Sequence, residues 1–68
     1  MDLRRGDTFT HRRWLDADKN ALACRITAVR RGVVYWRPVT GGHPYVFDIA
    51  DAAKYVTQGT LCRGGTTL

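Results

Sequence analysis

The sequence lacks the features that mark several common classes of protein. It has no glutamate, only two cysteines and two prolines, and no apolar run near the roughly 18 residues of a transmembrane helix. The first residues are charged and do not form the apolar stretch of a secretory signal. We therefore expect a cytoplasmic protein that does not enter a membrane.

Metal-binding and catalytic motifs are also missing. His11, His43, Cys24 and Cys62 are scattered, whereas zinc sites are usually built from close ligand pairs, and a reducing compartment disfavours a disulfide. The chain has no Walker loop, nucleophile elbow or Rossmann fingerprint. Its aspartates occur in segments typical of turns and helix starts. The sequence predicts no metal, no cofactor and no enzymatic activity.

What the chain does have is positive charge and enough apolar residues for one core. Lysine and arginine number 11 against 6 acidic residues, so the formal net charge is +5, which favours an anionic partner. Most of the cations are arginine, a bias that a GC-rich genome would also produce. A core in 68 residues supplies only about 3–5 kcal/mol, so homo-oligomerisation stays open.

Short alternating segments predict an all-β fold. The first strand begins around Phe9, a turn spans residues 16–20, and strands follow at residues 22–29, 33–37 and 45–47. In the hairpin over residues 24–37, a three-residue loop Arg-Arg-Gly would place Val29 opposite Val33, Thr27 opposite Tyr35 and Arg25 opposite Arg37. This register puts Cys24, Ile26, Ala28, Val34 and Trp36 on one apolar face.

After the fourth predicted strand, the spacing of apolar residues changes from that of a strand to that of a helix. Ile49, Ala52, Ala53 and Val56 recur at helical spacing, with Asp48 as the expected N-cap, and a last short strand could follow near residues 55–57. Residues 59–68 have little to bury. We expect one domain over residues 1–58, with a short helical turn near residues 48–55, and a flexible tail over residues 59–68.

Four to five short strands and one helical turn suggest a small, bent sheet closed into a barrel. The chain resembles small SH3-like barrel proteins of bacterial and phage genomes over about residues 4–58. The resemblance lies in four segments: Arg-Arg-Gly-Asp-Thr-Phe, Cys-Arg-Ile-Thr-Ala-Val, Arg-Arg-Gly-Val-Val-Tyr-Trp-Arg and Phe-Asp-Ile-Ala-Asp-Ala-Ala-Lys-Tyr-Val. It implies a barrel that binds a ligand on its surface, and it assigns no activity.

The predicted pairing of Arg25 with Arg37 identifies the first candidate site, because like charges facing each other across a sheet are destabilising. They could hold a phosphate or a partner's carboxylate, with Arg30 and Arg31 at the hairpin tip and Tyr35 as a stacking surface. The alternatives are that Asp48, Asp51 or another acid neutralises the pair, or that both side chains extend into water.

A second basic group lies near the start of the chain, where Arg12 and Arg13 follow Arg4 and Arg5 and precede Trp14. Its simpler interpretation is a solvated surface. Trp14 is expected to cover one end of the barrel and Trp36 to belong to the core.

The sequence supports two candidate functions. The first is a nucleic-acid-binding barrel, with DNA favoured over RNA, that contacts phosphates with weak sequence preference and strong salt dependence. The second is a protein-interaction module, such as a phage or mobile-element factor, that binds an acidic host protein or assembles with itself through a strand edge or its tail.

Overall fold

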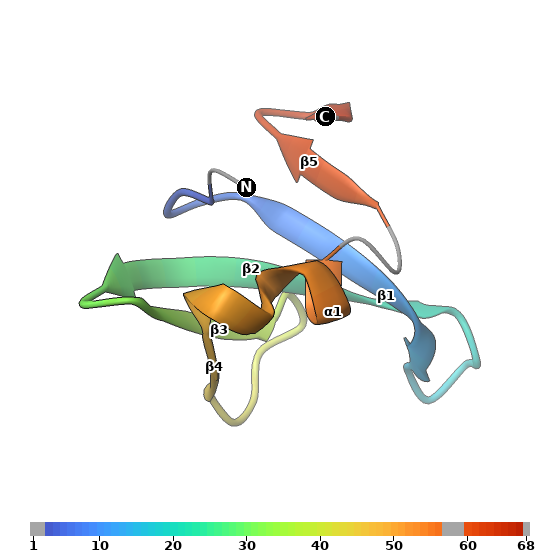
Figure 1. The fold of residues 1–68 in the computed structure, drawn as a ribbon. Helices are drawn as coiled ribbons and strands as arrows, with labels where there is room; N and C mark the ends of the chain where they lie inside the picture. The colour runs from blue at the N-terminus through green and yellow to red at the C-terminus, as the bar shows by residue number, and fades with distance from the viewer. Residues whose placement is uncertain (1–2, 57–59, 68) are drawn as a thin grey trace.

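The computed structural model describes residues 3–56 and 60–67, which form a mainly β protein. The antiparallel sheet of these residues has six strands in the order β4-β3-β2-β1-β5-β6 (Figure 1). The sequence correctly predicts a mainly β protein and the four strands β1 to β4. None of the described helices is long and apolar enough to cross a membrane. The elements are β1 (Thr8–Leu15), β2 (Ala21–Arg30), β3 (Val33–Pro38), β4 (Tyr45–Asp48), the 3₁₀ turn η1 (Ile49–Asp51), α1 (Ala52–Val56), β5 (Leu61–Arg63) and β6 (Thr66–Thr67).

The β2–β3 hairpin combines two registers. Arg25 pairs with Arg37, as the sequence predicts, but nearer the tip Arg30 pairs with Val33 across a two-residue turn. The predicted three-residue loop is therefore wrong. Arg31 and Gly32 both have positive φ, 51° and 77°, as a type I′ turn requires.

A bulge at Thr27 reconciles the two registers. The pairing shifts by one residue between Ile26 and Ala28, so Tyr35 lies opposite Ala28 and not opposite Thr27 as predicted. The Thr27 hydroxyl donates a hydrogen bond to the Tyr35 carbonyl at 3.3 Å. A bulge adds one residue to one strand, so the short turn forms while Cys24 and Ile26 stay on the core face. Beyond the bulge, Val29 takes the core face in place of Ala28.

The strand β1 contains a second irregularity. Its pairing with β2 shifts between Thr10 and Leu15, and the His11 Nδ1 atom accepts a hydrogen bond from the Arg13 amide at 3.1 Å. In this segment both His11 and Trp14 pack toward the core, where their rings stack. Trp14 is half-buried and packs against the core.

One face of the curved sheet carries the core. Trp36 is 6% exposed, and Cys24, Ile26 and Val34 are fully buried, which confirms four of the five residues predicted for the apolar face of the hairpin. The prediction is wrong for Ala28, which pairs with the exposed Tyr35, whereas Val29, opposite Val34, packs against the core. The helix α1 packs against β1 and adds Ala52 to this core. The described core comprises Leu3, Phe9, Cys24, Ile26, Val34, Trp36, Phe47, Ala52 and Val56.

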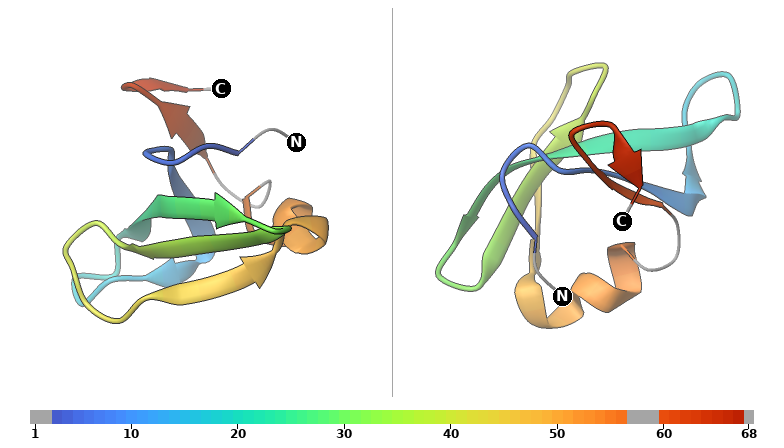
Figure 2. Two further views of the ribbon diagram at one scale, coloured as in Figure 1. Left: turned by 90° about the vertical axis from the view of Figure 1, so that its left-hand side faces the viewer. Right: turned by 90° about the horizontal axis from the view of Figure 1, so that it is seen from above.

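The helical period after β4 is confirmed by η1 and α1, which follow directly at the end of that strand (Figure 2). Asp48 occupies the N-cap position, but its side chain makes no capping hydrogen bond. The last strand expected near residues 55–57 is wrong for Tyr55 and Val56, because both belong to α1. Residue 57 lies outside the described residues.

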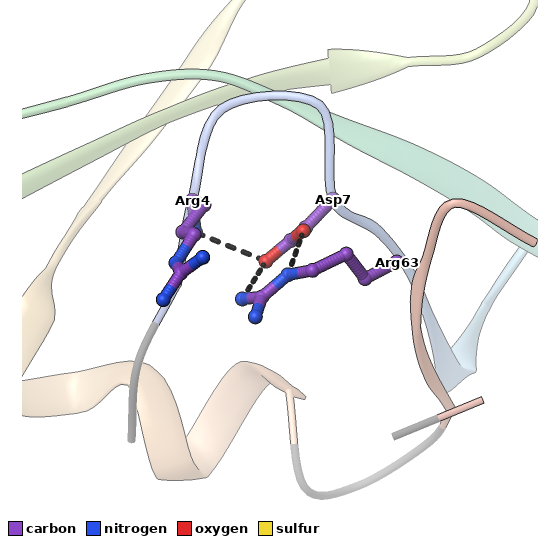
Figure 3. A network of polar contacts seen from close by, with 3 residues as sticks. All are labelled: Arg4, Asp7 and Arg63. Carbon is purple, nitrogen blue, oxygen red and sulfur yellow. Dashed lines mark hydrogen bonds and ion pairs between the residues drawn. The ribbon is translucent and has the colours of Figure 1, made fainter. Parts of the chain in front are cut away.

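The C-terminal segment differs from the flexible tail expected over residues 59–68. Its described residues, 60–67, form β5, which pairs with β1, and β6, which pairs with β5. Residues 59 and 68 lie outside the described part. A polar interaction supplies the physical reason: Arg63 on β5 forms an ion pair with the buried carboxylate of Asp7, just before β1 (Figure 3).

Candidate functional site: two hollows at the end of the third strand

Arg25 and Arg37 lie side by side on the solvent face of the β2–β3 hairpin. Arg37 donates a hydrogen bond from Nη2 to the Gly42 carbonyl at 3.2 Å, which links β3 to the loop before β4. The two arginines, with Pro38, Val39 and Gly41, line an open hollow of about 260 Å³.

The aspartates proposed as neutralising partners do not reach this arginine pair. Asp51 forms an ion pair with Lys54 at 3.5 Å, and Asp48 lies opposite Val33, near the hairpin tip. Within residues 3–56 and 60–67, no carboxylate lies at ion-pair distance from either guanidinium. The hollow therefore presents two positive charges that the described acids leave uncompensated.

The structure brings Arg30 and Tyr35 to the same face. Directly paired residues of an antiparallel ladder share a face, and residues two apart on β3 do so as well. Because Arg30 pairs with Val33, it belongs with Tyr35 and Arg37. Tyr35 is 39% exposed, and Arg31 stands exposed at the turn.

The second basic group predicted from the sequence is not gathered in one place. Arg4 and Arg5 lie in the turn before β1, whereas Arg13 is exposed near the other end of that strand. The side chain of Arg12 lies outside the described residues. The structure thus separates Arg13 from the first two arginines by most of β1.

A row of stacked rings occupies the opposite face of the same hairpin. The ring centroids of Trp14 and Trp36 are 5.1 Å apart with planes at 14°, and those of Trp36 and Tyr45 are 4.9 Å apart with planes at 23°. His11 stacks on Trp14 at 4.6 Å. At the exposed end, the His43 ring meets Tyr45 edge-on at 5.5 Å.

These rings border a second hollow, of about 350 Å³, which is lined by Trp14, Leu22, Trp36, Pro38 and Tyr45. Sequence analysis does not identify it. Trp14, Trp36 and Tyr45 come from three different strands, and the irregularity in β1 that brings Trp14 to Trp36 has no local sequence signal. The pairing of Trp36 with Tyr45 could have been found by extending the hairpin register across the next loop.

The two cysteines are free thiols that differ in burial. Burial raises the pKa of the Cys24 thiol from 9.0 to about 11, which keeps it protonated and unreactive near pH 7. Cys62 is a free, partly buried thiol. In the described part of the chain, no three histidine, cysteine or acidic side chains gather closely enough to hold a metal ion.

Comparison with known proteins adds no relative. No family model matches the chain, and neither a curated protein nor a solved structure is significantly similar to it. The function is therefore argued from the two hollows and the charges around them.

Proposed function

We propose that this chain binds nucleic acid, DNA in preference to RNA, through contacts between arginine and phosphate on the solvent face of the β2–β3 hairpin. The observation that carries the proposal is the pairing of Arg25 with Arg37 without a described carboxylate beside them. Two facing guanidinium groups repel each other until an anion lies between them. The net charge of +5 attracts a polyanion to the same surface.

We propose further that the sheet curls into a small SH3-like barrel. Support comes from the order of the elements, in which β1 to β4 follow one another, η1 and α1 come next, and β5 returns to the free side of β1. Such curling removes exposed strand edges, which a small sheet otherwise leaves open to aggregation. It would also place the arginines on the convex surface, where a long polymer can reach them.

The test is a fluorescence anisotropy titration of labelled mixed-sequence DNA at several salt concentrations between about 50 and 200 mM. The double variant Arg25→Gln/Arg37→Gln removes both charges of the hollow. If each arginine contacts one phosphate, the slope of log affinity against log salt should become shallower by about 2.

The two lysines of the chain provide a matched control. The double variant Lys19→Gln/Lys54→Gln removes the same net charge from exposed residues that do not line the hollow. It should leave the salt slope nearly unchanged. Equal effects of the two double variants would rule out a specific arginine site, and no DNA binding at the lowest salt would rule out the proposed function.

A second candidate function is protein interaction through strand addition at β4. This strand is an edge of the described sheet, and its Tyr45 and Val46 are among the most exposed large apolar side chains. Exposed strand edges accept a strand from another chain. Val46→Lys should weaken such an association sharply in sedimentation or pull-down measurements, whereas binding to DNA should not decrease.

A further inference from the structure

We propose that the aromatic hollow holds one unpaired nucleobase, so that the protein prefers single-stranded to duplex DNA. This inference rests on the proposed function and adds the form of nucleic acid that the site accepts. The hollow of about 350 Å³ falls within the range of about 300–1,000 Å³ typical of small-ligand sites. A base inside a duplex cannot enter it without leaving the stack.

The lining chemistry suits a flat aromatic ligand. Trp14 and Tyr45 are partly exposed, while Trp36, which stacks on both, is 6% exposed and holds the row in place. Every nucleobase has a π-face that can stack on an aromatic ring. His11 covers the Trp14 end of the row, so a base would add at the Tyr45 end. A cationic ligand would also meet aromatic rings, but no carboxylate lines the hollow, and a net charge of +5 opposes it.

The arginine hollow and the aromatic hollow open on opposite faces of the hairpin and meet at the end of β3, so that together they suit the two parts of a nucleotide, its phosphate and its base. Pro38, at the end of β3, lines both. The loop that follows also joins them, because Arg37 donates to Gly42 and the next residue, His43, contacts the Tyr45 ring. A single strand whose phosphates meet Arg25 and Arg37 therefore passes the end of β3, where one base can turn into the aromatic hollow.

The two tryptophans of the chain both line this hollow, so tryptophan emission reports directly on its occupancy. We expect unlabelled oligothymidine to quench the emission. The same oligonucleotide made entirely of abasic sites, and a duplex of equal length, should bind through phosphates without comparable quenching.

Substitution of Tyr45 tests the stacking without disturbing the core, because this side chain is 48% exposed. Tyr45→Val keeps a residue suited to a strand but removes the ring, and it should weaken oligothymidine binding at least about fivefold. Tyr45→Phe keeps the ring and should bind as the unmodified protein does. Neither variant should change affinity for the abasic strand.

The outcomes separate the two proposals. Duplex, abasic and single strands bound with equal affinity would overturn the base site and leave the phosphate site standing. The absence of binding to all three would overturn both. Quenching by an apolar or proline-rich peptide, but not by oligothymidine, would assign the hollow to a protein ligand and would also overturn the inference.

Discussion

The guanidinium of Arg63 donates two hydrogen bonds to the carboxylate of Asp7, each 2.9 Å long, from a position 56 residues further along the chain. The same carboxylate accepts the backbone amide of Arg4 at 2.9 Å, as Figure 3 shows. Asp7 is 1% exposed, so its charge depends on these donors. The ion pair therefore joins β5 to the turn before β1.

Replacing Arg63 should test how much this connection stabilises the fold. Arg63→Ala leaves a buried carboxylate without its main partner, and we expect a loss of about 1–3 kcal/mol in the free energy of unfolding, since Arg63 itself is about one-third exposed. Urea unfolding followed by tryptophan emission measures it. Lys54→Ala, which breaks an exposed ion pair with Asp51, should change stability by less than about 0.5 kcal/mol.

The free energy of unfolding should depend on pH through the carboxylate of Asp7. The hydrogen bonds from Arg63 hold the pKa of Asp7 below its ordinary value of 3.8. Because the pKa is lower in the folded state, the stabilisation is complete above the unfolded value and is lost as the pH falls through the folded value. Urea midpoints measured from pH 7 down to pH 2 should decrease more steeply for the unmodified protein than for Asp7→Asn.

The hairpin turn allows a charge to be removed without weakening the fold. Arg31 has a φ of 51°, which asparagine adopts more readily than arginine, and Asn-Gly is the preferred pair for a type I′ turn. Arg31→Asn should stabilise the protein by up to about 1 kcal/mol. If Arg31 contacts phosphate, the same variant should bind DNA more weakly, and lower stability could not explain that loss. Unchanged affinity at 50 mM salt would remove Arg31 from the proposed surface.

The two thiols should differ in reactivity. Burial raises the pKa of Cys24 to about 11, whereas Cys62 on β5 is partly exposed. Ellman's reagent at pH 7.5 should therefore modify one thiol per chain quickly and the second only after unfolding. Cys62→Ser should abolish the fast phase, and a fast phase that persists would show that Cys24 is accessible in the folded protein.

The sequence alone predicts the parts of the fold that depend on local periodicity. Cys24, Ile26, Val34 and Trp36 alternate with polar residues, and a strand buried on one face requires that pattern. The helical spacing after Phe47 is equally local. The register of Arg25 opposite Arg37 follows from the same alternation, so the sequence alone identifies the candidate arginine pair.

The features that sequence analysis missed depend on exceptions to periodicity. The bulge at Thr27 shortens the turn and places Val29 on the core face instead of Ala28. Two hairpins that differ by such a bulge have nearly the same pattern of apolar residues, because Ala28 and Val29 are both apolar. The segment around Arg63 has few apolar residues, so the sequence pattern does not predict the strand β5 there. Its stability comes from pairing with β1 and from Asp7, both distant in sequence.

The place of β1 between β2 and β5 also bears on the order in which the chain can fold. The β2–β3 hairpin closes over a two-residue turn, and β1 pairs with β2 across the short turn at residues 16–20. The other edge of β1 must wait for residues about 50 positions later, as in the hydrogen bond from the Thr60 amide to the Thr10 hydroxyl. Closing the longer loop costs more chain entropy, and contacts distant in sequence slow folding. During synthesis, the outer side of β1 therefore stays open to other strands until β5 has been made.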